Sequence, residues 1–311
     1  MLELLKNTNY QIIPRRWIMI SVSLVVILAG LVSLVVKGGP DYGIDFQGGY
    51  KFIVKFSGAT ELSQVREVVN GLGYSHSQVQ DFGSEHEVVI TLPLDETPTA
   101  AVAGSDPVQA QLSEALRARF PVVEISKEKV GPKIGGELRT QALWSIFYSL
   151  LGLIVYITWR FEFRFSIAAI VALMHNVIIM IGFFSLLNKQ IDLTVLGALL
   201  TLVGYSINDT IVVFDRIREN LRARRRDQSY AELVNVSINQ TLSRTIITGG
   251  SVLIVVAMLF FFGGAVIHDF AFTLFVGTLV GTYSSIFIAS PILVEWQAAS
   301  LRRRARRLAA A

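Results

Sequence analysis

One carboxylate in this sequence lies inside a long apolar stretch, where its chemistry depends on what it faces. Asp209 stands between Asn208 and Thr210, with apolar residues for about one turn on either side. A charged side chain inside a segment long enough to cross a bilayer is costly and is retained mainly where it has a partner or a task. We therefore expect Asp209 to face protein or water and to be the centre of the functional site.

The polar residues around Asp209 follow the repeat of a helix. In a helix of about 3.6 residues per turn, the polar positions of this segment fall in one narrow stripe. The stripe consists of Thr194, Thr201, Tyr205 and Asp209, with Asn208 and Thr210 as further polar support. Gly197 and Gly204 flank it one heptad apart, where small residues allow another helix to approach closely.

Arg244 is the expected partner of the buried acid. It lies at the start of the next apolar segment, which runs antiparallel to the first, so the two residues are predicted at nearly the same depth. An Asp–Arg pair in a low-dielectric setting holds the acid ionised, and opening the pair favours protonation, as proton coupling requires. A static ion pair that sets helix register is equally compatible with the residues.

Two further polar or small-residue patterns lie in the apolar segments. His175 and Asn176 are predicted near the middle of the membrane, where the histidine would relay protons or simply hydrogen-bond to a neighbour; we expect the second. Gly277 and Gly281 form a small-xxx-small pattern that predicts helix packing. Gly249 and Gly250 predict either close packing or a hinge.

The sequence lacks the motifs of soluble enzymes. It contains no P-loop, no His-Glu-x-x-His and no Gly-x-Ser-x-Gly, and it has no cysteine. We therefore expect a protein that is not an enzyme, binds no metal or cofactor and draws its energy from an ion gradient. The residues leave protons and sodium ions as alternatives.

Composition predicts a polytopic membrane protein. The chain of 311 residues is 52% hydrophobic and 17% charged, and apolar runs of about 20 residues recur along it. The predicted spans are 17–36, 139–159, 165–187, 193–214, 246–262 and 268–294. They divide the chain into an N-terminal segment 1–16, a first span 17–36, a small domain 37–138, a five-helix transmembrane region 139–296 with a link at 215–245, and a basic tail 297–311.

The arginines predict the orientation of the spans. With alternating helices, all the arginine clusters that flank spans fall on one side, which is the cytoplasmic side by the positive-inside rule. These clusters are Arg15–16, Arg160 and Arg164, six arginines within 216–226, and five within 302–307. Both termini are therefore predicted inside and residues 37–138 outside. Because the basic clusters flank membrane spans, we do not expect nucleic-acid binding.

The predicted outer domain has a mixed pattern. Alternating apolar residues predict strands at 49–56 and 85–92, with a further strand at 122–130. Helical spacing predicts helices at 61–72, with Thr60 as its cap, and at 108–120. This order suggests a ferredoxin-like α+β domain in which 93–107 is a loop. His76 and His86 are expected to be surface or strand residues rather than ligands.

Four blocks of the sequence resemble one family, SecF of the bacterial SecD–SecF protein-export complex. Residues 43–49 (GIDFQGG) look like the family's entry into its outer domain, and residues 130–138 (VGPKIGGEL) are similar to the block before its second span. Residues 204–220 and 239–245 resemble the signatures of its fourth and fifth spans. The resemblance covers nearly the whole chain, in the same order.

The resemblance implies a fold and a task. The fold would be half of a transporter of the resistance-nodulation-division type in the bacterial inner membrane, with SecD supplying the other six spans. The task would be late-stage preprotein export through the SecY channel, driven by the proton gradient. Asp209 and Arg244 map onto the family's proton-pathway residues. The chain departs from the family at Asn176, where members commonly carry an aspartate.

Two alternative functions share this architecture. The chain would be half of an exporter of lipids or small amphiphiles, although its small outer domain and the lack of a second extracytoplasmic insertion disfavour that hypothesis. Otherwise it would be a passive scaffold in which Asp209 and Arg244 form a structural pair.

Overall fold

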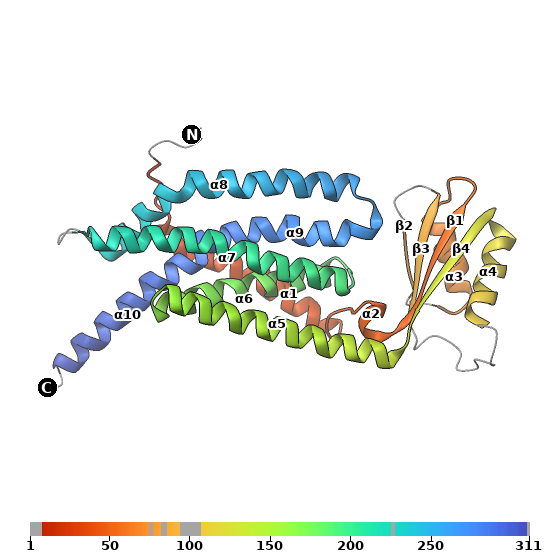
Figure 1. The fold of residues 1–311 in the computed structure, drawn as a ribbon, viewed down its shortest axis with the longest axis horizontal. Helices are drawn as coiled ribbons and strands as arrows, with labels where there is room; N and C mark the ends of the chain where they lie inside the picture. The colour runs from red at the N-terminus through yellow and green to blue at the C-terminus, as the bar shows by residue number, and fades with distance from the viewer. Residues whose placement is uncertain (1–7, 75–76, 82–85, 94–106, 225–227, 310–311) are drawn as a thin grey trace.

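The computed structural model describes residues 8–74, 77–81, 86–93, 107–224 and 228–309. Figure 1 shows a bundle of long helices with a small mixed domain at one end, and the end of α10 at the opposite end. The hydrophobic core is divided accordingly, since one cluster of buried side chains fills the domain and two fill the bundle.

Six helical segments of the described chain are long and apolar enough to cross a membrane. They are α1 (Arg16–Val36), α5 (Pro132–Arg160), α6 (Phe163–Leu186), α7 (Leu193–Arg222), α8 (Tyr230–Phe262), and a sixth composed of α9 (Ala265–Ser284), a π-helix (Ser285–Ala289) and α10 (Ser290–Ala309). A short 3₁₀ turn (Ile13–Arg15) precedes α1. The predicted fold class, a six-span helical membrane protein with a small α+β domain, is confirmed.

The helices extend beyond the predicted apolar runs. Much of the expected link at 215–245 is helical, because α7 continues to Arg222 and α8 begins at Tyr230. A capping box fixes the start of α8, where the Ser229 hydroxyl accepts from the backbone of Glu232 and the Glu232 carboxylate accepts from the backbone of Ser229. Apolar content indicates where a helix meets lipid, whereas caps determine where it ends.

The sixth span contains a π-helix that the sequence did not indicate. It occupies Ser285–Ala289 between α9 and α10 and is mostly buried. The hydroxyl of Ser290 donates to the carbonyl oxygen of Ser285 at 2.9 Å across this widened turn. Such bulges occur often near functional sites because they re-aim the helix beyond them.

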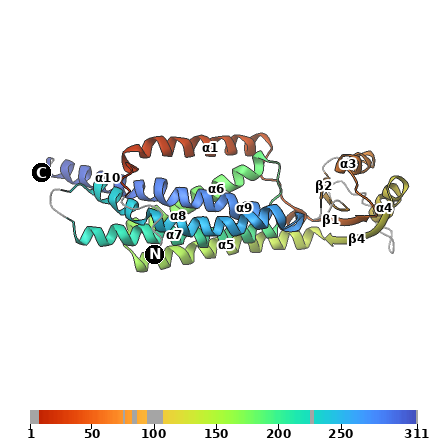
Figure 2. The same cartoon turned by 90° about the horizontal axis from the view of Figure 1, so that it is seen from above.

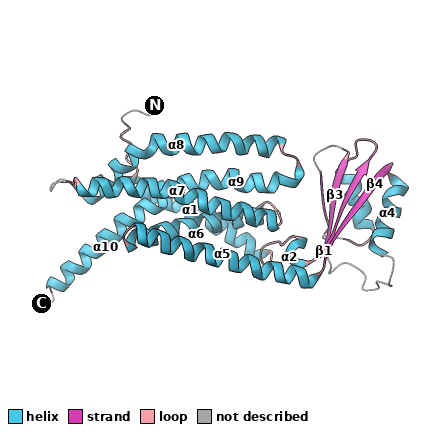
Figure 3. Ribbon diagram, viewed as in Figure 1, coloured by secondary structure: helices cyan, strands magenta, loops and turns pink. Residues whose placement is uncertain are grey.

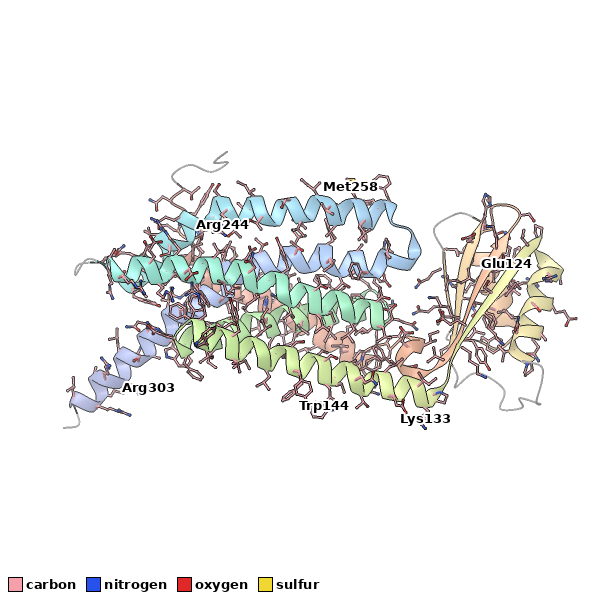
Figure 4. The ribbon with its side chains drawn as sticks, in the orientation of Figure 1. Glu124, Lys133, Trp144, Arg244, Met258 and Arg303 are labelled. Atoms are coloured by element: carbon pink, nitrogen blue, oxygen red, sulfur yellow. The ribbon has the colours of Figure 1, made fainter. Side chains whose placement is uncertain are left out.

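Burial is uneven among the spans. More than half of the apolar window of α6 is buried, against 11% for α1 and α5 and 17% for α8. Figure 1 shows α8 and α5 along opposite edges of the bundle, and Figure 2 shows α1 along its outer side. Trp144 on α5 points away from the bundle (Figure 4). These three helices therefore offer their apolar faces to lipid or to partner helices.

Two glycines permit the closest contact between α1 and α6. A Cβ atom at Gly30 would lie 2.7 Å from the Cα of Gly182, so neither position has room for a side chain. The hydroxyls of Ser33 and Ser185, one turn further on, are hydrogen-bonded at 2.7 Å. Small residues and a hydroxyl pair thus hold α1 against the bundle.

The small domain is a four-stranded antiparallel sheet with two helices. Its elements are β1 (Gly49–Phe56), α3 (Leu62–Gly71), β2 (Gln78–Asp81), β3 (Glu87–Pro93), α4 (Pro107–Arg119) and β4 (Val122–Val130). The strand order is β2-β3-β1-β4, that of the predicted ferredoxin-like sandwich. Figure 3 shows α4 beside the sheet, and Phe52, Phe56, Leu112 and Leu116 are fully buried between them.

Details of the domain differ from the sequence prediction. Thr60 is not the helix cap, because Glu61 occupies that position and the Thr60 hydroxyl donates to the carbonyl of Gly58 instead. The short strand β2 was not predicted, since four residues are too few to show a clear alternation. His86 lies exposed in a turn. His76 and residues 94–106 of the predicted loop lie outside the described residues.

The chain enters and leaves the domain at one junction. A short helix, α2 (Ile44–Gln47), follows the end of α1 and packs against the start of α5. A Cβ atom at Gly135 of α5 would lie 3.0 Å from the backbone nitrogen of Gly48. Tyr42 and Ile191 form a parallel bridge, so the same junction also contacts the connection between α6 and α7.

Candidate functional site

Asp209 is buried where α7 meets α9. Its side chain is 3% exposed, and the hydroxyl of Thr282 on α9 donates to its Oδ2 across 3.5 Å. That distance is at the long limit for a hydrogen bond, so the carboxylate is held weakly. The acid therefore faces a helix of its own chain rather than lipid.

Arg244 lies near Asp209 without contacting it. Figure 4 shows Arg244 on α8, and its side chain is exposed. Among the ion pairs of the described residues, none joins Arg244 to Asp209, although the two charges interact at longer range. Sequence spacing placed both residues at a similar depth, but it could not determine how each helix is rotated about its axis.

Thr282 occupies the position next to the acid, and the sequence analysis did not single it out. A Cβ atom at Gly249 of α8 would lie 3.1 Å from the Thr282 hydroxyl, so Thr282 lies between α7 and α8. The available signal was the run of hydroxyl residues in the sixth span, which includes Thr278, Thr282 and Ser284. Gly249 serves close packing here.

The other glycines of the sixth span bring α9 against α7. A Cβ atom at Gly281 would lie 3.1 Å from the Ser206 hydroxyl, and one at Gly277 would overlap the side chain of Leu202. Ser206 lies less than one turn before Asp209. The pattern of Gly277 and Gly281 thus positions Thr282 beside the acid.

A second group of polar side chains joins α6 to α7. The side chain of Asn176 donates to the hydroxyl of Ser206 at 2.8 Å, and its oxygen lies 3.1 Å from Nδ1 of His175. The ring of His175 stacks on Tyr283 of α9, with centroids 6.3 Å apart. His175 and Asn176 therefore belong to the same buried region as Asp209, on its α6 side.

Several buried polar atoms of this region have no hydrogen-bond partner in the described part of the chain. They are Nε2 of His175, the hydroxyl of Tyr205 and the hydroxyl of Thr245. Leaving such an atom unpaired costs about 1–3 kcal/mol.

The predicted stripe on α7 is divided between two environments. Each step of four residues advances about 40° around a helix, so Asp209 lies about 80° from Thr201. As a result Asp209 and Thr210 are buried, Tyr205 is half-buried, and Thr201 and Asn208 are exposed. Gly197 and Gly204 share the exposed side, where a Cβ atom would meet nothing within 4 Å among the described residues, apart from its chain neighbours and the nearby backbone of α7.

A second polar group lies at the opposite end of α7. Lys189 forms an ion pair with Asp269, and the Asp192 carboxylate accepts from the backbone N–H of Val195 at 2.7 Å. Burial raises the pKa of the Asp192 carboxyl above its ordinary value. Within the described residues, no three histidine or acidic side chains are placed to share a metal ion.

A family model and curated relatives match this chain. The model described as "Protein export membrane protein SecD/SecF, C-terminal" matches residues 111–299. The protein translocase subunit SecF of Desulfurispirillum indicum is 44% identical over 89% of this chain and 88% of its own length. That of Rhodothermus marinus is 43% identical over 97% of this chain and 98% of its own length.

Solved structures match the whole fold. The crystal structure of SecDF, a translocon-associated membrane protein from Thermus thermophilus, is 35% identical and superimposes with a TM-score of 0.82 over 94% of this chain. A second SecDF structure gives a TM-score of 0.71 over 99%. This chain spans 39% and 41% of those SecDF chains. By sequence and by fold, the chain belongs to the SecF family of protein translocase subunits.

Proposed function

We propose that this chain uses the proton gradient to promote late-stage export of preproteins through a SecY-type channel. Its family membership supports a role in protein export. The observation that carries the proton step is the burial of Asp209 beside a single weak donor, Thr282. A buried carboxylate is stabilised by hydrogen-bond donors or a cation when it is ionised. Protonation of the carboxylate weakens these interactions.

The coupling step is an exchange of partners at Asp209. When the acid is ionised, Arg244 on α8 is the one cation among the described residues whose charge influences it, across a distance longer than an ion pair. Closing Arg244 onto Asp209 stabilises the carboxylate, and protonation removes that attraction and releases the arginine. Because the two residues belong to different helices, the exchange shifts α8 relative to α7.

Asn208, Thr210, Tyr205 and Thr201 are the proposed polar support of the proton pathway, and each has a different position. Thr210 is buried and donates to the carbonyl of Ser206, while Tyr205 lies one turn from the acid, and its hydroxyl has no hydrogen-bond partner among the described residues. Thr201 and Asn208 are exposed on the same side of α7 as Gly197 and Gly204, where no described helix packs against the two glycines. His175 hydrogen-bonds to Asn176 and is not required to carry a proton.

SecD is the proposed obligate partner. The exposed faces of α1, α5 and α8 are apolar, and the exposed side of α7 carries Gly197 and Gly204 without a helix against them. The SecDF chains are more than twice as long as the part that this chain matches. A second set of spans packed on α7 would shield Thr201 and Asn208 from lipid.

The proposed orientation places both termini in the cytoplasm and the α+β domain outside a bacterial inner membrane. Figures 1 and 2 support it, because α1 begins and α10 ends at the end of the bundle opposite to the domain. The C-terminal turns of α7, which carry Arg216, Arg218 and Arg222, and the arginine-rich part of α10 lie at that same end of the bundle. In this proposal the chain catalyses no reaction and needs no cofactor, and the ion gradient supplies the energy.

Asp209→Asn tests the proposal, with Asp215→Asn as its matched control. Both variants replace one carboxylate by an amide on α7, but Asp215 is an exposed partner of Arg160 and Arg218. Export by membrane vesicles that contain the complex should lose its stimulation by a proton gradient in the first variant and keep it in the second. Co-purification with SecD should be unchanged in both.

Three other results would distinguish the alternatives. Full stimulation of export by Asp209→Asn would refute the proton step and favour a scaffold. Stimulation of export by a sodium gradient instead of a proton gradient would identify sodium as the coupling ion. Asp209 would then remain the proposed coupling site. Gradient-driven efflux of lipid without any effect on preprotein export would favour the exporter hypothesis.

A further inference from the structure

A groove lies between α1 and α10, at the end of the bundle where the chain termini lie. It has a volume of about 560 Å³, within the range of about 300–1,000 Å³ that is typical of small-molecule sites. Ile20 of α1 forms one wall, and α10 forms the rest. None of the residues discussed for the proton step takes part in it.

The inner part of the groove is apolar. Pro291, Ile292 and Trp296 line it together with Ile20, and Trp296 remains 41% exposed. Ile20 follows Arg16 and Trp17 by one turn, at the level where the charged N-terminal segment gives way to the apolar span. Tryptophan is enriched at this depth in membrane proteins, because it is apolar but carries one polar group.

The outer part of the groove is basic. Arg303, Arg304 and Arg307 line it, and no ion pair involves any of the three among the described residues. The only acid in the lining, Glu295, is already bound by Arg16 through Nη2 at 2.9 Å and Nε at 3.0 Å. The groove therefore presents three uncompensated guanidinium groups next to an apolar surface.

The helical repeat of α10 places some of its arginines in the groove and others outside it. Trp296, Ala299, Arg303 and Arg307 are spaced by three, four and four residues, so they follow one side of α10. Arg302 and Arg306 have the same spacing from each other but do not line the groove. Figure 4 shows Arg303 on the part of α10 that extends beyond the bundle.

We propose that this groove binds one anionic phospholipid. Guanidinium groups bind phosphate oxygens through paired hydrogen bonds, so Arg303, Arg304 and Arg307 hold the headgroup. The acyl chains lie against Ile20, Ile292 and Trp296 and continue along the exposed face of α1. A free phosphate ion would use only the basic half of the site and leave the apolar half in water. The lipid ties α10 to α1 at the membrane surface.

The test compares two double variants of the full-length chain in detergent. Arg303→Gln with Arg307→Gln removes two groove arginines, and Arg302→Gln with Arg306→Gln removes two charges from the same helix at the same spacing. Native mass spectrometry measures binding of dioleoylphosphatidylglycerol, with dioleoylphosphatidylcholine as the lipid of equal chain length and no net charge. The groove variant should lose affinity for the anionic lipid by about 30-fold, the effect of two basic residues near an anionic lipid surface.

Each outcome decides the proposal. Retention of the anionic lipid by Arg302→Gln with Arg306→Gln, within twofold of the wild type, supports a localised site. An equal loss in both variants would reduce the effect to general attraction by a basic tail. Equal binding of phosphatidylcholine would also overturn the proposal, as would displacement of the lipid by millimolar inorganic phosphate.

Discussion

The carboxylate of Asp45 accepts a hydrogen bond from the backbone N–H of Leu193, with 3.0 Å between Oδ2 and the nitrogen. Leu193 is the first residue of α7. The backbone N–H of Val195, in the same first turn, donates to the side chain of Asp192. Two acids from different segments thus satisfy the start of the helix that carries Asp209. The Gly43 N–H also donates to the carbonyl of Ile191 at 2.9 Å. The segment that enters the α+β domain is therefore bound directly to α7.

Asp45→Ala should loosen this connection. It leaves the Leu193 N–H without its acceptor and removes a negative charge near a helix N-terminus, which costs about 0.5–2 kcal/mol for a capping interaction. Thermal unfolding in detergent should show a lower midpoint, and Asp45→Asn should recover part of the loss because it keeps an acceptor oxygen. Equal midpoints for wild type and Asp45→Ala would show that the bond contributes nothing.

Asp192 should make stability depend on pH. Burial is the main cause that raises its pKa above the ordinary value of 3.8; the Val195 N–H opposes the shift, and the charges of Asp45 and Asp269 add to it. A carboxyl whose pKa is higher in the folded state lowers stability as pH rises from that ordinary value through the raised one. Asp192→Asn should therefore unfold at a higher temperature than wild type at neutral pH, and the gain should disappear in acid.

The control for this pH dependence is Glu219→Gln, which removes an exposed carboxylate whose side chain is 68% accessible. Its unfolding temperature should follow that of the wild type across the same pH range. If Asp192→Asn were less stable than wild type at neutral pH, the capping role of the charged carboxylate would outweigh the cost of burying it.

Thr282→Val removes the hydroxyl beside Asp209 and keeps the shape of the side chain. The carboxylate then loses its only hydrogen-bond donor among the described residues, and the loss of one hydrogen bond costs about 0.5–1.5 kcal/mol, with the low end expected for a bond this long. We expect a lower unfolding midpoint and weaker gradient-driven export, measured in detergent and in vesicles respectively. Thr282→Ser keeps the hydroxyl and should retain most of both; similar values for the two variants would assign Thr282 to packing alone.

Two glycines in helix interiors should respond in opposite ways to alanine. A Cβ atom at Gly182 of α6 would lie 3.0 Å from the Cα of Gly30, whereas one at Gly152 of α5 would have no neighbour within 4 Å. Gly152→Ala should stabilise the protein by up to about 1 kcal/mol through helix propensity. Gly182→Ala should destabilise it by about 1–3 kcal/mol, because α1 and α6 must separate. Unfolding midpoints that rise in both variants would show that α1 can move freely.

Local sequence patterns were sufficient for the six spans and most of the small domain. An apolar run of bilayer length predicts a spanning helix whatever its neighbours are, because the membrane itself supplies the surroundings. In the domain, β1 was predicted at its observed bounds because one side of the strand is buried and the alternation is strong. The sheet edge was missed at β2, whose four residues have little pattern of their own.

The sequence alone also indicated which acid lies within a span and which family the chain resembles, and it predicted Arg244 as the partner of that acid. Only the tertiary structure decided that Asp209 faces Thr282 rather than contacting Arg244. The rotation of each helix about its axis depends on close contacts between distant segments, such as Gly281 with Ser206 and Gly30 with Gly182. Such contacts produce no periodic pattern in the sequence. Each depends on the fit between two helix surfaces, and that fit cannot be read from either segment alone.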